Sequence, residues 1–172
     1  MSLAVGDLAP DFTLPDTDGG EQSPGGAPAT LVVFTCNHCP YALGWHDRIA
    51  AVAGDYADVK VLAVNPNDAE RYPRDSFEAM RRRVEEDGGW PVPYLRDDDQ
   101  SIATAFGAKT TPDVFVVARD GTLAYRGAPD ADYQDPAQGA SWLRGAVDAV
   151  LAERRPDPAE TEPVGCSVKW KA

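Results

Sequence analysis

The sequence predicts a single α/β domain, because two apolar runs enclose a helical pattern and a pair of short apolar segments follows later in the chain. Residues 29–35 form an apolar run typical of a strand buried on both faces of a sheet. A helical pattern and a second run, residues 59–64, follow and complete a β-α-β unit. Residues 114–118 and 122–126 flank a turn and predict an antiparallel hairpin. With 172 residues, 43% of them hydrophobic, the domain is large enough to bury its core without cross-links.

Local patterns predict the elements around the first buried strand. Residues 9–16 alternate in hydropathy and end at Asp18-Gly19-Gly20, which predicts a short N-terminal strand or hairpin. The helix after residue 39 carries apolar residues at helical spacing, and His46 falls on the same stripe. These apolar residues are Leu43, Ile49, Ala50 and Ala53.

Two further helices are predicted between the second strand and the hairpin. Asp75-Ser76-Phe77-Glu78 has the pattern of a capping box, and the helix that it opens should stop at Gly88-Gly89. Residues 91–95 then lead into a short helix over residues 101–106. Both helices precede Thr111-Pro112, which stands just before the hairpin.

The end of the chain divides into a helix and a tail. Asp135-Pro136 is expected to cap a last helix with one long apolar stripe. The domain is therefore expected to span residues 1–153. Residues 154–172 are rich in Pro and Glu and are expected to be loosely ordered or packed back on the domain.

Charge and the N-terminal sequence narrow the classes of function. The net charge of −12 repels nucleic acid and anionic lipid, and no basic stripe offsets it. Neither a nucleic-acid partner nor a membrane partner is therefore expected. Residues 1–7 have no basic segment followed by an apolar one, so they do not resemble a signal peptide. We expect a cytoplasmic protein.

The strongest chemical signal is the Cys-x-x-Cys of Cys36 and Cys39, placed where a buried strand gives way to a helix. If Cys36 lies at the mouth of the helix, backbone N–H groups and the helix dipole stabilise its thiolate. Cys39 then lies one turn further along, close enough to form a disulfide. An attacking thiolate and a resolving partner form a dithiol/disulfide redox centre.

Two other interpretations of the cysteines are open from the residues alone. A Cys-x-x-Cys is also half of a structural zinc site, but such sites need a second pair of ligands. Only Cys166, His38 and His46 remain, and they form no second pair at zinc-site spacing. The other interpretation is that both cysteines are inert members of the core.

The order of these elements, with the Cys-x-x-Cys at the first strand-to-helix junction and Thr111-Pro112 before the hairpin, resembles the thioredoxin fold over roughly residues 4–153. The resemblance implies a central mixed β-sheet flanked by helices, with an N-terminal β-hairpin extension. The opening Ala9-Pro10-Asp11-Phe12-Thr13-Leu14 is similar to that of the redoxin branch, which includes AhpC/TSA peroxiredoxins and TlpA- and ResA-like thiol-disulfide oxidoreductases. Cys36-Asn37-His38-Cys39-Pro40-Tyr41 and the tail Gly165-Cys166-Ser167-Val168-Lys169-Trp170 are similar to a set of poorly characterised bacterial thioredoxin-like proteins.

The resemblance implies roles for several residues. Cys36 would be the attacking thiol and Cys39 the resolving one, with Asn37, His38 and Pro40 as supporting residues. The Thr111–Pro112 bond would be cis and would face the dithiol, offering backbone groups to an extended substrate segment.

The residues around the pair would tune its chemistry. His38 is expected to favour the Cys36 thiolate and make the disulfide more oxidising, unless it is only a solvent-exposed side chain. Thr30 stands where related reductants often carry a buried acid, so proton transfer from Cys39 would use water or another acid such as Asp113.

The expected function is thiol-disulfide oxidoreduction on protein or small-molecule disulfides, with a recycling reductase as a second partner and neither a cofactor nor a resident metal. The first alternative is a thiol peroxidase. Such enzymes place a Thr three residues before the reactive Cys, whereas Val33 precedes Cys36 here and Thr35 points to the opposite face of the strand. Arg126 could lie near a peroxide pocket, but an exposed hairpin position is expected.

A second alternative is a Cu(I)-binding metallochaperone, in which His46 or Cys166 joins the two thiolates. Cys166 is also a possible third thiol of the redox centre. The tail that carries it could fold over the site, so that Cys166 exchanges with Cys36 or shields it. The alternative is a free surface thiol in a mobile terminus.

Overall fold

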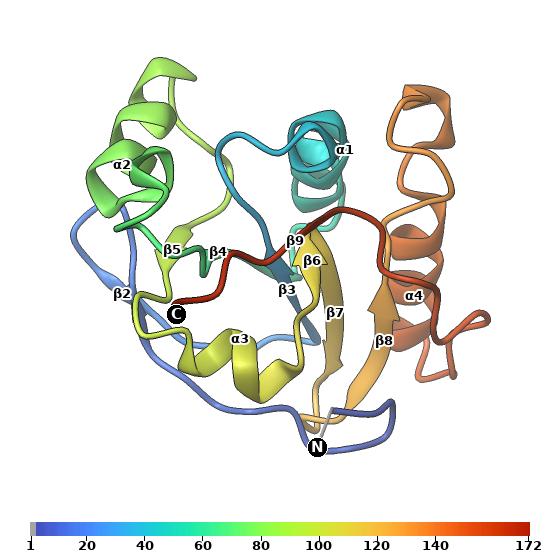
Figure 1. Ribbon diagram of the computed structural model, residues 1–172. Coiled ribbons are helices and arrows are strands. Elements are labelled where there is room, and N and C mark those ends of the chain that lie inside the picture. The colour runs from blue at the N-terminus through green and yellow to red at the C-terminus, as the bar shows by residue number, and fades with distance from the viewer. Residues whose placement is uncertain (1–2) are drawn as a thin grey trace.

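The computed structural model describes residues 3–172 and has a five-stranded mixed sheet at its centre (Figure 1). The strands follow the order β5-β4-β3-β7-β8. β3 pairs in parallel with β4, and β4 with β5, whereas β7 runs antiparallel to both β3 and β8. Their bounds are Ala29–Phe34 (β3), Lys60–Asn65 (β4), Tyr94–Arg96 (β5), Asp113–Ala118 (β7) and Leu123–Gly127 (β8). The predicted α/β class, the β-α-β unit and the antiparallel hairpin are confirmed.

Helices cover both faces of the sheet, and every residue of the central strand β3 is therefore buried. Leu31 and Val33 point to the face on which α1 (Pro40–Asp55), α2 (Phe77–Glu86) and α4 (Ser141–Leu151) pack. Val32 and Phe34 point to the other face, where α3 (Ser101–Phe106) lies. The alternation of side chains along a strand therefore gives two apolar cores.

The core on the α3 side is aromatic. Phe34, Phe106 and Phe115 meet edge to face, with ring centroids 5.2 to 5.7 Å apart. Each fully buried phenylalanine contributes about 1.5–3 kcal/mol relative to an exposed one. These contacts fix the carboxyl end of β3, from which the Cys-x-x-Cys loop departs.

A buried ion pair joins the start of α4 to α1. Asp130 accepts hydrogen bonds from the Arg48 guanidinium at 2.8 Å and from the Trp45 indole at 2.8 Å, both on α1. It also accepts the backbone N–H of Ala140, the residue before α4, at 2.9 Å. One carboxylate therefore holds α1 in place, and with it the segment that carries both cysteines.

The N-terminal hairpin is formed by β1 (Leu14–Pro15) and β2 (Glu21–Gln22), which pair antiparallel across a turn. The backbone N–H groups of Asp18 and Gly20 both donate to the Asp16 carboxylate at 2.9 Å, which closes this turn. The predicted hairpin extension is confirmed.

The structure corrects the sequence interpretation at two helix starts. α2 is capped by Ser76, whose side chain accepts the N–H of Ala79, and Asp75 is not part of the cap. Asp135 caps only a 3-10 turn, Pro136–Gln138, because Gly139 and Ala140 take left-handed conformations and α4 starts afterwards.

The last residues of the chain lie against the domain (Figure 1). After α4 the chain runs beside β8, where the Thr161 N–H donates to the Arg126 carbonyl oxygen at 3.0 Å. It then crosses the carboxyl end of β3, and β9 (Cys166–Ser167) pairs antiparallel with β6 (Thr110–Thr111). Neither of these two-residue strands was predicted. No helix within residues 3–172 is both long and apolar enough to cross a membrane.

Candidate active site

The two cysteines lie between β3 and α1, and both are buried. Cys36 and Cys39 are each 1% exposed and are free thiols. The helix begins at Pro40, a residue suited to the first helical position because it has no N–H to leave unpaired. The spacing had suggested that Cys36 lies at the mouth of the helix and Cys39 one turn further along. Instead, Cys39 is the residue before the helix and Cys36 lies in the preceding loop.

Thr111 contacts both sulfur atoms. Its hydroxyl oxygen lies 3.3 Å from Cys36 Sγ, and its carbonyl oxygen accepts a hydrogen bond from Cys39 Sγ at 3.2 Å. The Thr111–Pro112 peptide bond is cis, which is the form that the resemblance implies. Thr111 is fully buried, so these contacts are shielded from water.

The two thiols titrate as a pair. A hydrogen bond between Cys36 and Cys39 pushes their two pKa values apart, and burial adds to the cost of charging either sulfur. The Thr111 carbonyl only accepts, so it favours a proton on Cys39, whereas the Thr111 hydroxyl is able to donate to a charged Cys36. These two contacts favour a thiolate at Cys36, whereas the interaction between the thiols raises the pKa of Cys36 and lowers that of Cys39. The pair therefore holds one thiolate.

Asn37 holds the loop between the cysteines in place. Its side-chain oxygen accepts hydrogen bonds from the Tyr94 hydroxyl at 2.7 Å and from Arg83 at 3.1 Å. Arg83 also donates to the carbonyl oxygen of Cys36 at 3.0 Å. Sequence reasoning missed Tyr94 and Arg83, which lie 57 and 46 residues from Asn37.

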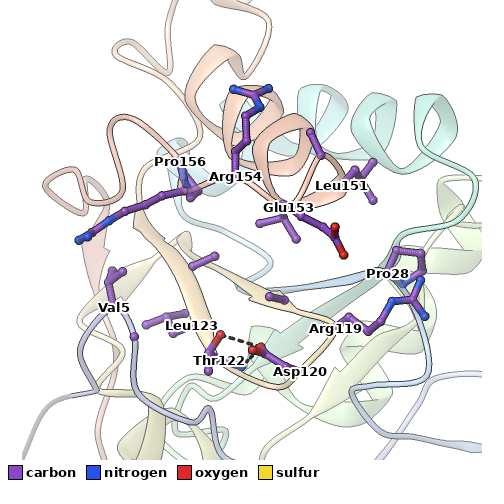
Figure 2. A pocket seen from close by; sticks show the side chains of 16 residues that line it. Val5, Pro28, Arg119, Asp120, Thr122, Leu123, Leu151, Glu153, Arg154 and Pro156 are labelled. Atoms are coloured by element: carbon purple, nitrogen blue, oxygen red, sulfur yellow. Dashed lines mark hydrogen bonds between the residues drawn. The ribbon is translucent and has the colours of Figure 1, made fainter.

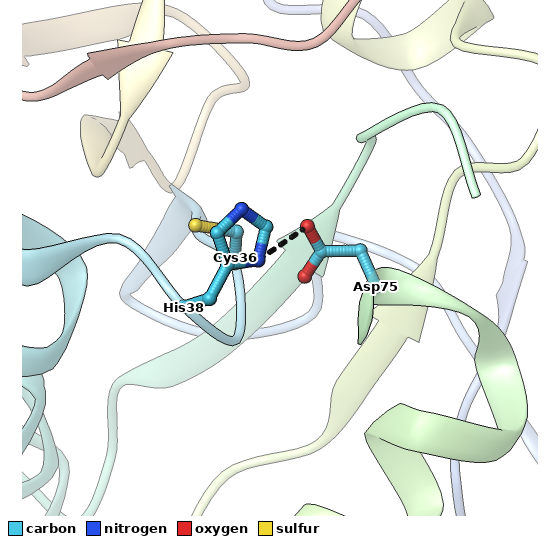
Figure 3. Close-up of side chains that lie close together, drawn as sticks. All are labelled: Cys36, His38 and Asp75. Carbon is cyan, nitrogen blue, oxygen red and sulfur yellow. Dashed lines mark ion pairs between the residues drawn. The ribbon is translucent and has the colours of Figure 1, made fainter. Parts of the chain in front are cut away.

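His38 faces a buried carboxylate (Figure 3). Its Nδ1 lies 3.1 Å from Asp75 Oδ2, and the imidazole stacks on Tyr72 with centroids 6.3 Å apart. The Nδ1–H of His38 does not point along a regular hydrogen bond to Asp75. The contact is therefore an ion pair when His38 is protonated. The side chain of His38 is 25% exposed and that of Asp75 is fully buried.

Asp75 is the main site residue that the sequence analysis did not find. It accepts the backbone N–H of Asn37 at 2.8 Å and the side-chain amides of Asn65 and Asn67, each at 3.0 Å. A buried carboxylate needs such donors to remain charged. The only sequence signal was an acidic residue before a helix, which indicated a cap.

Cys36, His38 and Asp75 also form a set of candidate metal ligands. Within residues 3–172 they are the only three such residues whose donor atoms all lie within 4.8 Å of one another. Asp75 already has three N–H donors besides His38, so binding a cation there would break existing hydrogen bonds. The donor set fits a metal less well than it fits an ion pair.

Cys166 lies beside Cys39. Hydrogen bonding to Cys166 is among the causes that lower the pKa of Cys39, and Cys166 packs against the cluster formed by Cys36, Cys39 and Ala42. Burial, the hydrogen bond to Cys39 and the charge of Cys39 raise the pKa of Cys166 to about 11. Cys166 is partly exposed, unlike the other two cysteines. The structure thus places the third thiol in the site, next to Cys39 rather than Cys36.

Three other candidate residues from the sequence lie elsewhere. His46 packs on Trp90 with ring centroids 4.5 Å apart, and burial lowers its pKa. Thr30 accepts the N–H of Gly25 through its hydroxyl. Arg126 is 5% exposed, so the expectation of an exposed position was wrong.

The contacts of Arg126 and Asp113 do not include a cysteine. Arg126 donates to the carbonyl oxygens of Leu3 and Gly107, and its guanidinium lies over Phe115. Asp113 is buried, and burial raises its pKa to about 6. One of its oxygens accepts the Lys109 N–H at 3.0 Å and the other has no partner.

A cavity is present at the other end of the sheet (Figure 2). It has a volume of about 930 Å³ and lies between the β7–β8 turn, with Arg119 and Asp120, and the end of α4, with Glu153 and Arg154. Because Ala118 of β7 pairs with Ala29 at the start of β3, this end is opposite the cysteines. The dithiol is therefore part of a packed surface and not of this cavity.

Comparison with known proteins agrees with this geometry. Residues 5–126 match the AhpC/TSA family. A hypothetical protein from Sinorhizobium meliloti 1021 is 37% identical with a TM-score of 0.90, covering 100% of this chain and 97% of that one. An uncharacterised conserved protein from Geobacillus kaustophilus is also 37% identical, with a TM-score of 0.89 and coverage of 98% and 93%.

A more distant structure supports the fold assignment. A putative thioredoxin from Neisseria meningitidis is 26% identical with a TM-score of 0.66, over 84% of this chain and 89% of that one. The predicted thioredoxin-like fold is confirmed. No curated protein matches the sequence.

Proposed function

The chain belongs to the AhpC/TSA family of thioredoxin-like redox proteins, and from this and its paired cysteines we propose that it is a thiol-disulfide oxidoreductase. The observation that carries the proposal is that the Cys36 and Cys39 side chains pack in one buried cluster and that both sulfurs contact Thr111 beside cis-Pro112.

In the proposed reaction Cys36 is the nucleophile. Its thiolate attacks one sulfur of a substrate disulfide, forms a mixed disulfide and releases the first substrate thiolate. Cys39 then loses its proton and attacks Cys36 Sγ, which forms the Cys36–Cys39 disulfide and releases the second substrate thiolate. The protein loses two electrons, the substrate gains them, and the two protons of the protein thiols balance those taken up by the products.

Thr111 supports both steps through different atoms. Its hydroxyl, 3.3 Å from Cys36, stabilises the attacking thiolate. Its carbonyl oxygen, 3.2 Å from Cys39, accepts a hydrogen bond from the second thiol in its protonated form. The proposed substrate is a disulfide in a protein or small molecule, and a dithiol reductase would return the protein to the reduced state.

His38 and Asp75 would tune the equilibrium. A protonated His38 next to Cys36 favours the thiolate and hence the reduced form, which makes the disulfide a better oxidant. Asp75 Oδ2, 3.1 Å from His38 Nδ1, would be the ion-pair partner of the imidazolium.

Single-thiol variants test the assignment of the nucleophile. The double variant C39S/C166S retains only Cys36, and C36S/C166S retains only Cys39. With oxidised glutathione, the Cys36 protein is expected to form the glutathione adduct at least tenfold faster, followed by intact mass. Equal rates, or a faster Cys39 protein, would contradict the assignment.

Peroxide reduction is the second candidate, favoured by one contact. The Thr111 hydroxyl lies beside Cys36, as the hydroxyl in a peroxidase pocket would, although it comes from β6 rather than from three residues upstream. Against it, Arg126 donates to the carbonyl oxygens of Leu3 and Gly107 rather than to Cys36. Arg83 does reach Cys36, but it donates to the carbonyl oxygen of that residue. Consumption of hydrogen peroxide by the wild type, lost in C36S, would favour this activity.

Copper binding is the third candidate and rests on the thiols alone. His46 packs on Trp90. Within the described residues, the three cysteine sulfurs do not all lie within 4.8 Å of one another. A stoichiometric Cu(I) complex that competes with a chelator and is weakened by C166S would support it. Binding that is unchanged by C166S would exclude Cys166 as the third ligand.

A further inference from the structure

The reactive pair is covered by the tail of its own chain. Cys36 and Cys39 are each 1% exposed, and Cys166 of β9 is the partly exposed residue of the same cluster. Thiol exchange requires a direct approach of one sulfur to another. While the tail is in place, a disulfide between Cys36 and Cys39 would therefore be less accessible to an external thiol than Cys166 is.

The tail is held at this position by backbone pairing. Cys166 is the register partner of Thr111, whose hydroxyl and carbonyl contact the two sulfurs. Gly165 is required for this approach, because a Cβ there would lie 2.5 Å from the Thr111 carbonyl oxygen. The tail thus pairs with the backbone beside cis-Pro112, the place where an extended substrate segment was expected to bind.

The residues after Cys166 fix the tail at its other end. Val168 is 3% exposed within the core on the α3 side, and its N–H donates to the Lys109 carbonyl at 3.1 Å. Lys169 donates to Asn67 at 2.9 Å and accepts the N–H of Asp68 at 2.8 Å through its backbone. Cys166 is therefore part of an ordered strand and not of a free end.

Cys39 is the common neighbour of the other two sulfurs. All three cysteines pack in one cluster, and both Cys36 and Cys166 are among the causes that lower the pKa of Cys39. The three sulfur atoms are not all within 4.8 Å of one another in the described chain. This order, Cys36 then Cys39 then Cys166, runs from the buried loop to the partly exposed tail.

From this order we propose that Cys166 is a third redox thiol, which takes the disulfide from the Cys36–Cys39 pair by exchange at Cys39 and presents it to an external dithiol. The proposal rests on the thiol-disulfide chemistry proposed above. It assigns to the tail the position at which the recycling reductant reacts.

The exchange involves no net oxidation. The Cys166 thiolate attacks Cys39 Sγ, the Cys39–Cys166 bond forms, the Cys36–Cys39 bond breaks, and Cys36 leaves as the thiolate. The proton lost by Cys166 balances the one that Cys36 takes up. An external dithiol then attacks Cys166 Sγ and releases Cys39, and its second thiol completes the transfer of two electrons to the protein.

Oxidation of the pair also changes the surroundings of Cys166. Of the causes that raise its pKa, two depend on Cys39 as a thiol or thiolate, namely the hydrogen bond and the charge. Neither is present when Cys39 is in a disulfide, and the ammonium of Lys169 then favours the Cys166 thiolate. Formation of the Cys36–Cys39 disulfide thus makes Cys166, the thiol that attacks it, more reactive.

Oxidation of the full chain carrying C36S tests the exchange. After equilibration with oxidised glutathione, we expect an intramolecular Cys39–Cys166 disulfide in most molecules, mapped by mass spectrometry of peptides without reduction. If C36S gives only separate glutathione adducts or free thiols, while the wild type forms Cys36–Cys39, the inference is wrong and the proposed function stands. If the wild type forms no Cys36–Cys39 disulfide, the proposed function itself fails.

The rate of reduction tests the role of the tail. We expect oxidised C166S to be reduced by dithiothreitol at least tenfold more slowly than the oxidised wild type, because its disulfide stays covered. Equal rates would overturn the assignment of Cys166 as the reaction position.

Two glycine substitutions test whether the Cys39–Cys166 disulfide depends on the pairing of the tail with Thr111. G165A displaces the tail from Thr111, whereas G54A on α1 places a methyl group in open space. We expect G165A to weaken the Cys39–Cys166 disulfide in the C36S background and G54A to leave it unchanged. An undiminished disulfide in G165A would contradict the strand geometry as its cause.

Discussion

Thr111 is the residue that joins the two halves of the site. It lies 75 residues from Cys36 and 72 from Cys39, yet it contacts both sulfurs with two atoms of different hydrogen-bonding character. A hydroxyl that donates to a thiolate stabilises it by more than a bond between neutral groups does. The reactivity of Cys36 should therefore depend on this side chain.

Thr111→Val tests that dependence because it removes the hydroxyl and keeps the shape and the carbonyl. In the C39S/C166S background, we expect Cys36 to react with oxidised glutathione about tenfold more slowly, since a hydrogen bond to a charged group is worth roughly 1.5–3 kcal/mol. Thr104→Val on α3, whose hydroxyl bonds only the Gln100 carbonyl, is the control. An unchanged rate in T111V would show that the contact does not act on the thiolate.

The two histidines provide a matched pair for the redox equilibrium. H38A should make the reduction potential of the Cys36–Cys39 pair more negative by about 30 mV, or about 1.4 kcal/mol for two electrons, because the reduced form loses a cation beside Cys36. H46A should leave the potential unchanged, since His46 packs on Trp90. A potential that rises or stays constant in H38A would remove His38 from the tuning of the site.

Local and distant residues of the site differ in how far the sequence predicts them. The Cys-x-x-Cys, Pro40 and Thr111-Pro112 follow from short motifs and from the family resemblance. Asp75 and Arg83 are brought to the loop only by the packing of α2. Their side chains carry no signal of this role, because an acid before a helix and an arginine within one are common in surface helices.

Among the elements, α1 carries the cysteine loop and depends on a buried ion pair. Arg48 and Asp130 have side chains that are 8% and 0% exposed, and their nitrogen and oxygen lie 2.8 Å apart. Removing one member of such a pair leaves the other charge without a partner in the interior. The stability of the α1–α4 contact should therefore be sensitive to either residue.

Asp130→Ala should lower the free energy of unfolding by about 3–5 kcal/mol, because it leaves the Arg48 guanidinium uncompensated. Urea denaturation followed by circular dichroism measures the loss. Glu78→Ala, which breaks the exposed pair with Arg82 on α2, is the control and should change stability by less than about 1 kcal/mol. Equal effects of the two changes would show that burial does not determine the strength of the Arg48 pair.

Element length explains which elements the sequence predicts. The six-residue strands β3 and β4 and the ten-residue helix α2 each carry a complete apolar period, and all three were predicted. β5 has three residues and β6 and β9 have two each, which is too short for a periodic signal. These strands form because a neighbouring strand or the folded tail supplies their hydrogen bonds.

For the molecule as a whole, one buried acid should give folding a distinct dependence on pH. Burial raises the pKa of Asp113 to about 6 from a usual value of 3.8. The protonated form is therefore favoured in the folded state. Its contribution to stability is fully present below about pH 3.8 and is lost as the pH rises through about 6.

Asp113→Asn should remove this dependence while retaining an acceptor for the Lys109 N–H. The unfolding free energy of the wild type relative to D113N should fall by up to about 3 kcal/mol between pH 4 and pH 7, at about 1.36 kcal/mol for each pKa unit. Asp58→Asn, at an exposed position, removes the same formal charge and is the control. Its unfolding free energy should change with pH in parallel with that of the wild type. If the unfolding free energies of D113N and the wild type also change with pH in parallel, Asp113 is not the source of the pH dependence.

The central claim concerns the chemistry of the Cys36–Cys39 pair, and its most direct test is equilibration of the full chain in glutathione redox buffers with mass mapping of every disulfide. We predict reversible formation of Cys36–Cys39 with a single two-electron potential. A value near −270 mV, as in thioredoxin, would indicate a reductant, and one of about −120 to −180 mV an oxidant or isomerase. If Cys36 and Cys39 never join under any buffer composition, the account of this site as a thiol-disulfide centre is contradicted.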